Sequence, residues 1–251
     1  MFIKKESIKK LLLLLVGGVL IMTTVTGCIG PSDKKIVGKF TDFVNMFPTE
    51  DLTILYDKEG DASELEDGDL GIWTISSSKY LRSEKGRERI GVVIWFNRNT
   101  KEAKGTFSKS ITKNEKVIED IEYPIYYDKD GLHFSDKNIE APLVKELDDF
   151  KMMYEYISIG RKYLNTLEPK DFYYNGAAPL YGVRYKLTSE DINIKKIKEL
   201  YPNIPIDEDN LILSLEGRGD DWETTNNFTI DIQLDSNDDN YMTAMMSFDN
   251  N

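Results

Sequence analysis

Cys28 is the residue whose neighbours predict a definite chemical reaction, and it is the one cysteine of the 251-residue chain. Val25, Thr26 and Gly27 precede it, which is the order of residues in a bacterial lipobox. A cysteine in that position receives diacylglycerol on its sulfur and becomes the new N-terminus after cleavage. Acyl chains such as palmitate contribute about 0.8 kcal/mol per buried CH₂ group, so two or three chains anchor a protein stably. We therefore predict lipidation of Cys28.

The segment before Cys28 has the order of a secretory signal. Four lysines lie within residues 4–10, an apolar run covers residues 11–22, and small residues follow. This order predicts a signal peptide over residues 1–27, which is removed, and an acylated tether over residues 28–35. The alternatives are a transmembrane helix, for which the run is shorter than the required span of about 20 residues, and a cytosolic domain with a buried cysteine. We expect a lipid-anchored protein on the extracytoplasmic face of the cell membrane.

The charge balance bounds the partners that the chain can bind. It has 32 Lys and Arg against 44 Asp and Glu, a formal net charge of −12. Removing residues 1–27 takes away four lysines and Glu6, which leaves 28 basic against 43 acidic residues and a net charge of −15. A surface of that sign repels phosphate backbones, so nucleic acid is not an expected partner.

Histidine and cysteine are too scarce for most catalytic or metal centres. The one histidine, His133, lies between Leu132 and Phe134 on an alternating segment, which predicts a side chain turned toward solvent. A Ser-His-Asp triad needs a positioned histidine, and structural zinc sites need several Cys or His ligands. We therefore expect no catalytic residue, no metal and no cofactor, and a protein that is not an enzyme.

Hydrophobic periodicity predicts a fold that mixes helices with a sheet. Apolar residues recur at helical spacing over residues 36–47 and 143–157, with shorter helical patterns over 52–56 and 188–201. Period-two alternation predicts strands over residues 70–76, 89–96, 103–112, 117–127, 132–134, 181–187, 211–215, 228–234 and 241–248. Residues 171–179 are expected to form an aromatic-rich loop. The prediction is an α+β fold, a mostly antiparallel β-meander sheet packed with about three to four amphipathic helices, as a single domain over residues 36–251.

Two acidic segments, residues 57–69 and 235–240, contain part of the ligand spacing of a calcium loop. Position twelve of such a loop is a bidentate glutamate, but it falls on Gly68 in the first segment and on Met246 in the second. We favour a solvated loop for the first segment and a polar hairpin turn for the second.

An integrin-type tripeptide is present at Arg218, Gly219 and Asp220, in a predicted loop between two strands. An adhesive role requires the loop to project the two charged side chains apart. A three-residue match occurs often by chance, and glycines with charged residues are typical of an ordinary turn. The turn is the favoured interpretation, and the adhesive loop is the alternative.

Several segments resemble the staphylococcal tandem-type lipoproteins, the conserved staphylococcal antigen family. The matching segments are the lipobox at residues 25–28, then residues 55–60, 68–75, 97–100, 103–105, 174–176 and 203–205. The resemblance implies a membrane-anchored surface lipoprotein that is associated with innate immune stimulation through its lipid and with host-cell entry. It transfers one residue-level function, acylation of the cysteine at position 28. The tripeptide at residues 218–220 does not resemble a motif of that family.

Two functions from different classes follow from these features. The first is a non-enzymatic interaction protein at the cell surface, with a host protein among its partners. The second is a small-ligand or lipid-binding lipoprotein with an apolar cleft, for which the candidate lining residues are Tyr173, Tyr174, Tyr181 and Tyr185. A cavity of about 300 Å³ or more would favour the second function.

Overall fold

The computed structural model describes residues 33–49, 51–60, 65–175, 177, 179–218, 227–237 and 239–249. Residues Met1–Pro31 form one unit and Ser32–Asn251 form a second, compact unit. The predicted signal peptide, the lipobox and Cys28 therefore lie outside the described residues. The first described helix already begins at Asp33, within the segment predicted as a tether.

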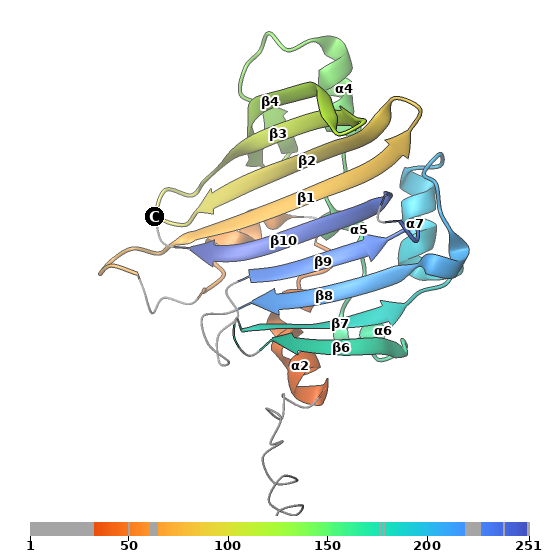
Figure 1. Ribbon diagram of the computed structural model, residues 1–251. Coiled ribbons are helices and arrows are strands. Elements are labelled where there is room, and N and C mark those ends of the chain that lie inside the picture. The colour runs from red at the N-terminus through yellow and green to blue at the C-terminus, as the bar shows by residue number, and fades with distance from the viewer. Residues whose placement is uncertain are drawn as a thin grey trace, which may run out of the picture. The chain divides into compact units, whose positions relative to one another are not determined.

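One antiparallel sheet of ten strands organises the compact unit (Figure 1). The strands are β1 (Ile72–Ser83), β2 (Gly86–Asn97), β3 (Glu102–Lys113), β4 (Lys116–Asp128), β5 (Gly131–Phe134), β6 (Pro169–Asn175), β7 (Leu180–Lys186), β8 (Ile212–Arg218), β9 (Asn227–Gln233) and β10 (Tyr241–Asp249). Their order in space is β5-β4-β3-β2-β1-β10-β9-β8-β7-β6. Consecutive strands therefore lie side by side, except that β5 and β6 lie at opposite edges of the sheet and the first strand pairs with the last at its centre.

The pairing of β1 with β10 joins two five-stranded meanders into one sheet. Trp73 on β1 lies opposite Phe248 on β10 and opposite Phe96 on β2. The same register aligns Ile75 with Met246, which places these apolar side chains on one face. Because side chains alternate along a strand, the next residues point to the opposite face, which is more polar.

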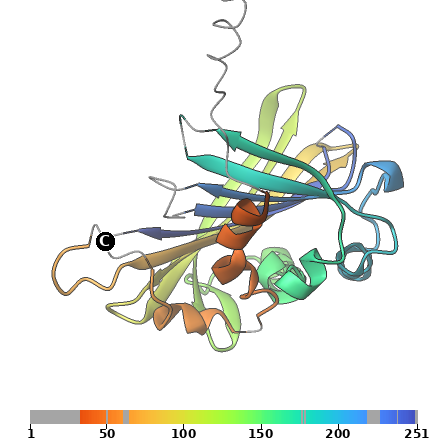
Figure 2. The same cartoon turned by 90° about the horizontal axis from the view of Figure 1, so that it is seen from below.

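The helices are short. Those that pack on the sheet lie on this apolar face, which we call the covered face (Figure 2). The opposite face has no helical layer in the described part of the chain. They are α2 (Asp33–Lys39), α3 (Thr41–Val44), η1 (Leu52–Tyr56), α4 (Ala141–Asp149), α5 (Met153–Tyr156), α6 (Arg161–Leu164), α7 (Ile192–Leu200) and η2 (Glu208–Asn210). At the α2–α3 junction, Phe43 stacks on Phe228 of β9 with ring centroids 5.0 Å apart, and the Phe40 ring lies tilted against Phe228 at 5.4 Å. We call the opposite face the open face.

The predicted α+β fold with amphipathic helices packed on the sheet is wrong, because the structure is dominated by the sheet and no α-helix in the described segments exceeds nine residues. Residues 143–157 illustrate the cause. The helix α4 ends before Phe150, whose backbone is extended, and α5 is a single turn between the extended residues Met152 and Ile157. All three of these side chains are buried, so an irregular segment reproduces the apolar spacing of a helix. In residues 143–157, the helical spacing of apolar residues therefore results from burial and not from a continuous helix.

The strand predictions were confirmed for nine of the ten strands, with two local errors. Residues 171–179 were expected to form a loop, but β6 runs through Asn175 and pairs with β7. The polar residues after Ser76 were expected to form a turn, but β1 continues to Ser83. Helix α7 and the hairpin between β9 and β10 lie where the pattern predicted them.

Candidate binding surfaces

The structure tests the sequence-predicted functional residues only in part. Arg218 is the last residue of β8 and is exposed, whereas Gly219 and Asp220 lie outside the described residues, as does Cys28. The adhesive loop therefore stays a prediction. His133 was predicted to face solvent, and this is confirmed, because it lies half-exposed on β5 and stacks on Tyr126 with ring centroids 5.0 Å apart.

The outer edge of β4, residues 116–123, is an uncovered strand edge of the N-terminal meander. Strand β5 pairs with β4 over residues 125–128, and the N–H of Ser135 donates to the Pro124 carbonyl at 2.9 Å, so residues 116–123 carry no strand partner on their outer side in the described part of the chain. Val117 and Ile118 are 62% and 58% exposed there. Unpaired backbone groups on a strand edge bind other chains unless a lysine, a proline or a bulge blocks them. Here the pairing with β3 shifts at Ile118 and Pro124 lies near the end of the edge, so residues 119–123 are the stretch open to pairing.

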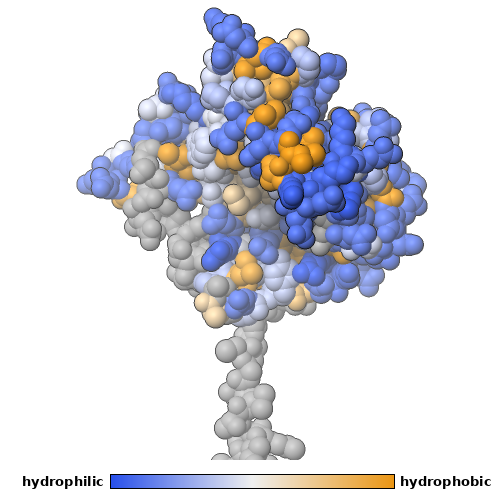
Figure 3. All heavy atoms as spheres, turned by 45° about the horizontal axis from the view of Figure 1, so that its top comes forward, coloured by the Kyte–Doolittle hydropathy of each residue, from blue (hydrophilic) through white to orange (hydrophobic). Residues whose placement is uncertain are grey.

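The chemistry of this edge combines apolar and acidic groups. Figure 3 turns the top of the sheet, where β4 and α4 lie, toward the viewer and shows apolar surface there among hydrophilic surface. Val117 and Ile118 are followed by Glu119, Asp120 and Glu122, which the sequence places along the same strand. An extended segment that pairs with this edge would meet apolar contacts at one end and negative charge beyond them.

A second feature is a basin of about 830 Å³ on the open face, where the ends of β1, β9 and β10 meet β6, β7 and β8. Its lining includes a stacked pair of tyrosines, Tyr80 and Tyr241, with ring centroids 4.2 Å apart and planes at 11°. The guanidinium carbon of Arg87 lies 5.4 and 5.5 Å from the two ring centroids, a cation–π geometry. Loss of solvent on burial, together with the neighbouring Tyr80, raises the pKa of Tyr241 to about 12, so its hydroxyl is protonated at neutral pH.

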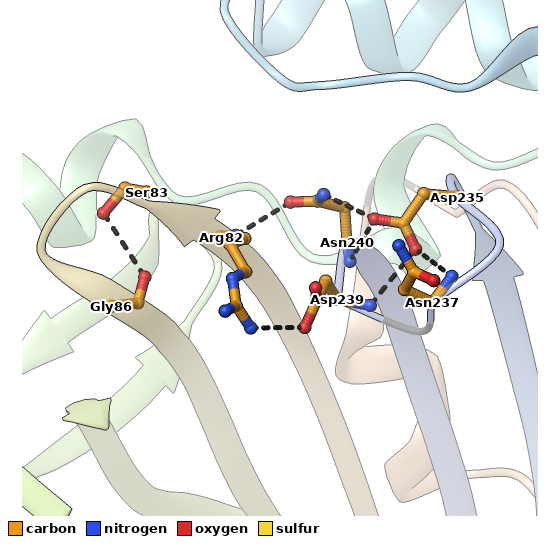
Figure 4. A network of polar contacts seen from close by, with 7 residues as sticks. All are labelled: Arg82, Ser83, Gly86, Asp235, Asn237, Asp239 and Asn240. Carbon is orange, nitrogen blue, oxygen red and sulfur yellow. Dashed lines mark hydrogen bonds and ion pairs between the residues drawn. The ribbon is translucent and has the colours of Figure 1, made fainter. Parts of the chain in front are cut away.

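A hydrogen-bonded turn holds one rim of the basin (Figure 4). The turn between β9 and β10 begins at Asp235, whose carboxylate accepts hydrogen bonds from the backbone N–H groups of Asn237, Asp239 and Asn240 at 3.0–3.1 Å. Asn240 also accepts a bond from the backbone N–H of Arg82 at 2.8 Å, and the Arg82 guanidinium pairs with Asp239 at 3.0 Å. The network therefore fixes the turn against the end of β1.

A third feature is a cleft of about 530 Å³ between α2, α6 and the edge strand β6. Its lining is rich in apolar side chains, among them Val37, Leu164, Leu167 and Phe172. Of the four tyrosines proposed for an apolar cleft, Tyr185 lines this one, whereas Tyr181 is fully buried in the core. Tyr173 lies elsewhere, where its hydroxyl donates to Glu216 at 2.7 Å.

Sequence reasoning missed the outer edge of β4 and the basin for different reasons. The edge could have been noticed, because the three-residue strand predicted at 132–134 is too short to cover the eleven-residue partner predicted at 117–127. The basin had no local signal, since its residues come from strands that are distant in the sequence.

Within the described segments, no group of three or more His, Cys, Asp or Glu side chains is arranged to hold a metal ion. None of the helices described is long and apolar enough to cross a membrane.

The fold and these surfaces define an antiparallel-sheet protein with one covered face, one open face and a free edge. The chain belongs to the Csa1 family, whose model matches residues 32–251. It is 32% identical over 194 residues to an uncharacterized lipoprotein of Staphylococcus aureus strain MSSA476, covering 75% of this chain and 70% of that protein. Two uncharacterized lipoproteins of strain N315 are 32% and 33% identical, covering 78% and 80% of this chain and 81% and 80% of their own lengths.

The resemblance to a staphylococcal lipoprotein family is therefore confirmed. Membership implies that the protein associates with a membrane through a lipid anchor, since the relatives are named lipoproteins.

Proposed function

We propose that this lipoprotein is a non-enzymatic interaction protein at the cell surface, which presents the outer edge of β4 to a protein partner. The observation that carries the proposal is the uncovered edge itself, with Val117 and Ile118 more than half exposed. Unpaired strand edges bind extended segments of other chains by backbone hydrogen bonds, while side chains on alternate positions select among those segments. The acidic residues along the same strand favour a partner segment that is basic.

The anchor sets where that edge is displayed. Acylation of Cys28 would tether the domain to the extracytoplasmic face of the membrane, and the helix α2 begins five residues later. Two consequences are part of the proposal. The lipid stimulates innate immunity, and the protein domain contributes to host-cell entry by binding a host protein.

The test displays the full chain on staphylococcal cells that lack the genes for related lipoproteins. Three versions are compared with the wild type: Cys28→Ala, the pair Val117→Ser with Ile118→Ser, and Ile192→Ser. Ile192 lies on α7 and is 57% exposed, so it is a matched control for loss of an exposed apolar side chain away from the edge. The measurements are palmitate labelling, attachment to host epithelial cells and cytokine release from immune cells.

Each version has a distinct expected result. Cys28→Ala loses palmitate labelling, attachment and cytokine release, because the anchor is gone. The edge pair retains labelling and cytokine release but reduces attachment at least about fivefold, since two apolar contacts are worth about 1 kcal/mol each. Ile192→Ser behaves as the wild type. Attachment that is unchanged in the edge pair, or reduced equally in Ile192→Ser, would count against a role for the edge.

The apolar cleft between α2 and β6 favours lipid or small-ligand binding as a second candidate function. At about 530 Å³ it exceeds the volume of about 300 Å³ expected of a small-molecule site. A fluorescent fatty acid such as cis-parinaric acid is a suitable probe. Leu167→Asp, in the cleft, should weaken its binding at least about tenfold because a charge enters an apolar site. Leu70→Asp, at an exposed position outside the cleft, is the control. Equal probe affinity in wild type and Leu167→Asp would exclude this candidate.

A further inference from the structure

The basin on the open face carries a charge opposite to that of the protein as a whole. The chain has a formal net charge of −12, yet three cations, Arg87, Lys170 and Arg184, line the basin. Two carboxylates face them, Asp231 in the lining and Asp171, which pairs with Arg184 at 3.7 Å, so the cations remain in excess. A positive hollow on an acidic protein concentrates anions locally, while the surrounding surface repels them. Charge complementarity therefore favours an anion over a neutral or cationic ligand.

The two guanidinium groups are held by aromatic rings. Arg87 lies over the stacked pair Tyr80 and Tyr241, and the guanidinium carbon of Arg184 lies 5.2 Å from the ring centroid of Tyr173. A guanidinium that is stacked on a ring directs its N–H donors sideways, in the plane that forms paired hydrogen bonds with phosphate or carboxylate oxygens. Stacking also lowers the entropy cost of ordering the side chain when a ligand binds.

The remaining lining matches a ligand with many hydroxyl groups. Neutral amide and hydroxyl side chains line the basin between the cations: Asn210, Ser214, Gln233, Ser236 and Thr243. Hydroxyl groups both donate and accept hydrogen bonds, as sugar hydroxyls do. The side-chain amides of Asn210 and Gln233 already donate to Asp207 and to the Asp235 carbonyl, so they offer chiefly their oxygens as acceptors. The volume of about 830 Å³ is far larger than a bare inorganic anion requires and lies in the range of sites for small organic ligands.

We infer that the basin binds an anionic saccharide, a sugar that carries phosphate or carboxylate, with the basic side chains holding the anionic group. This site is separate from the outer edge of β4, so the inference does not depend on the proposed function. Phosphate and carboxylate share the same recognition chemistry, and the choice between them is a result of the test.

The experiment titrates the full chain in a mild non-ionic detergent by calorimetry. The probes are glucose 6-phosphate, glucuronate, uncharged glucose and inorganic phosphate. At least one of the two anionic sugars should bind. Glucose and inorganic phosphate should each bind at least about tenfold more weakly, because glucose lacks the anionic group and inorganic phosphate lacks the sugar hydroxyls. The anionic sugar that binds more tightly identifies the anion.

Variants then test whether binding occurs in the basin. Arg184→Gln and Lys170→Gln, both at exposed positions on the rim, should each weaken binding of the anionic sugar about tenfold through loss of a charge-assisted hydrogen bond. Lys104→Gln is the matched control, because it removes the same charge. Lys104 lies on the open face outside the basin, opposite Trp95. It should change affinity less than about twofold. Thermal melting confirms that each variant is folded, and Lys170→Gln replaces Arg184→Gln if the latter is not.

Three results would overturn the inference. The first is the absence of binding by either anionic sugar to the wild type. The second is equal affinity for inorganic phosphate, which would show an anion site without sugar recognition. The third is an equal loss in Lys104→Gln, which would show dependence on overall charge rather than on the basin. The pair Val117→Ser with Ile118→Ser should leave sugar binding unchanged, so failure of this inference and failure of the proposed function are distinguishable.

Discussion

Ser77 accepts a hydrogen bond from the backbone N–H of Met153 at 3.0 Å, in the middle of the covered face of the sheet. Ser77 is 2% exposed, and Val92 and Ala244 are its partners on the adjacent strands. A polar side chain in an apolar layer is therefore used to satisfy the backbone of an irregular covering segment. The bond joins α5 directly to β1.

Loss of this bond should destabilise the fold measurably. In Ser77→Ala the buried N–H of Met153 loses its partner, so the free energy of unfolding should fall by about 1–3 kcal/mol. Urea denaturation followed by circular dichroism measures the change. Ser76→Ala, one residue earlier and facing the opposite side of the sheet, is the control and should change stability by less than about 0.5 kcal/mol. Equal losses in the two variants would contradict this role of Ser77.

Asn193 makes a second connection of the same kind, at the start of α7. Its side-chain oxygen accepts from the backbone N–H of Ser158 at 2.7 Å, and its amide donates to the Ser158 carbonyl at 2.9 Å. Asn193→Ala leaves both backbone groups without this partner, so unfolding should require about 2–4 kcal/mol less. Asn203→Ala, at an exposed turn position, should be close to neutral. A thermal melting shift in Asn193→Ala no larger than that of the control would refute the prediction.

The turn at Asp235 should be stabilised by its own hydrogen bonds and not by calcium. Four donors of the turn bind the two oxygens of this carboxylate, including the Asn240 side chain at 2.6 Å. Asp235→Ala should therefore lower stability by about 1–3 kcal/mol, whereas Ser236→Ala, at the next and exposed position, should have little effect. Millimolar calcium should shift the melting temperature of the wild type no more than that of Asp235→Ala. A calcium-dependent rise confined to the wild type would show that the turn binds the ion.

Glu155 should make stability depend on pH. Burial raises the pKa of this carboxyl above the ordinary glutamate value, although the N–H of Met152 donates to it at 2.7 Å and opposes the shift. The folded state therefore holds the proton more tightly than the unfolded chain, so ionisation costs stability as the pH rises above about 4.5. Glu155→Gln should match the wild type at pH 4 and exceed it in stability at pH 7. Urea midpoints at both values measure this, with Glu84→Gln, in an exposed turn, as the control for removal of one charge.

The strands were largely predictable because their signal is local. Residues such as Phe228, Ile230 and Ile232 alternate with polar residues, and a strand with one buried face requires that alternation wherever it lies in the sheet. The helices over residues 36–47 and 143–157 were predicted too long, because buried irregular segments place apolar side chains at similar intervals. Phe150, Met152 and Ile157 show this directly, since extended backbone separates them from helical turns.

The candidate surfaces were mostly beyond prediction. The basin brings Arg87 of β2 beside Tyr241 of β10 and across from Arg184 of β7, and no local pattern connects these positions. Their proximity depends on strand order, which long-range pairing decides. The outer edge of β4 likewise exists because β5 is short, so its exposure is a property of the assembled sheet.

The sequence by itself determined the predicted lipidation of Cys28, the acidic charge and the positions of most strands. Each of these depends on neighbouring residues or on simple composition. Only the tertiary structure decided that β1 and β10 pair at the centre, that helices cover one face, and that the open face carries a basic basin. The physical reason is that backbone hydrogen bonds between strands are chemically alike for every pair of strands. The choice of partners therefore follows from how the whole apolar face is buried, which no single segment encodes.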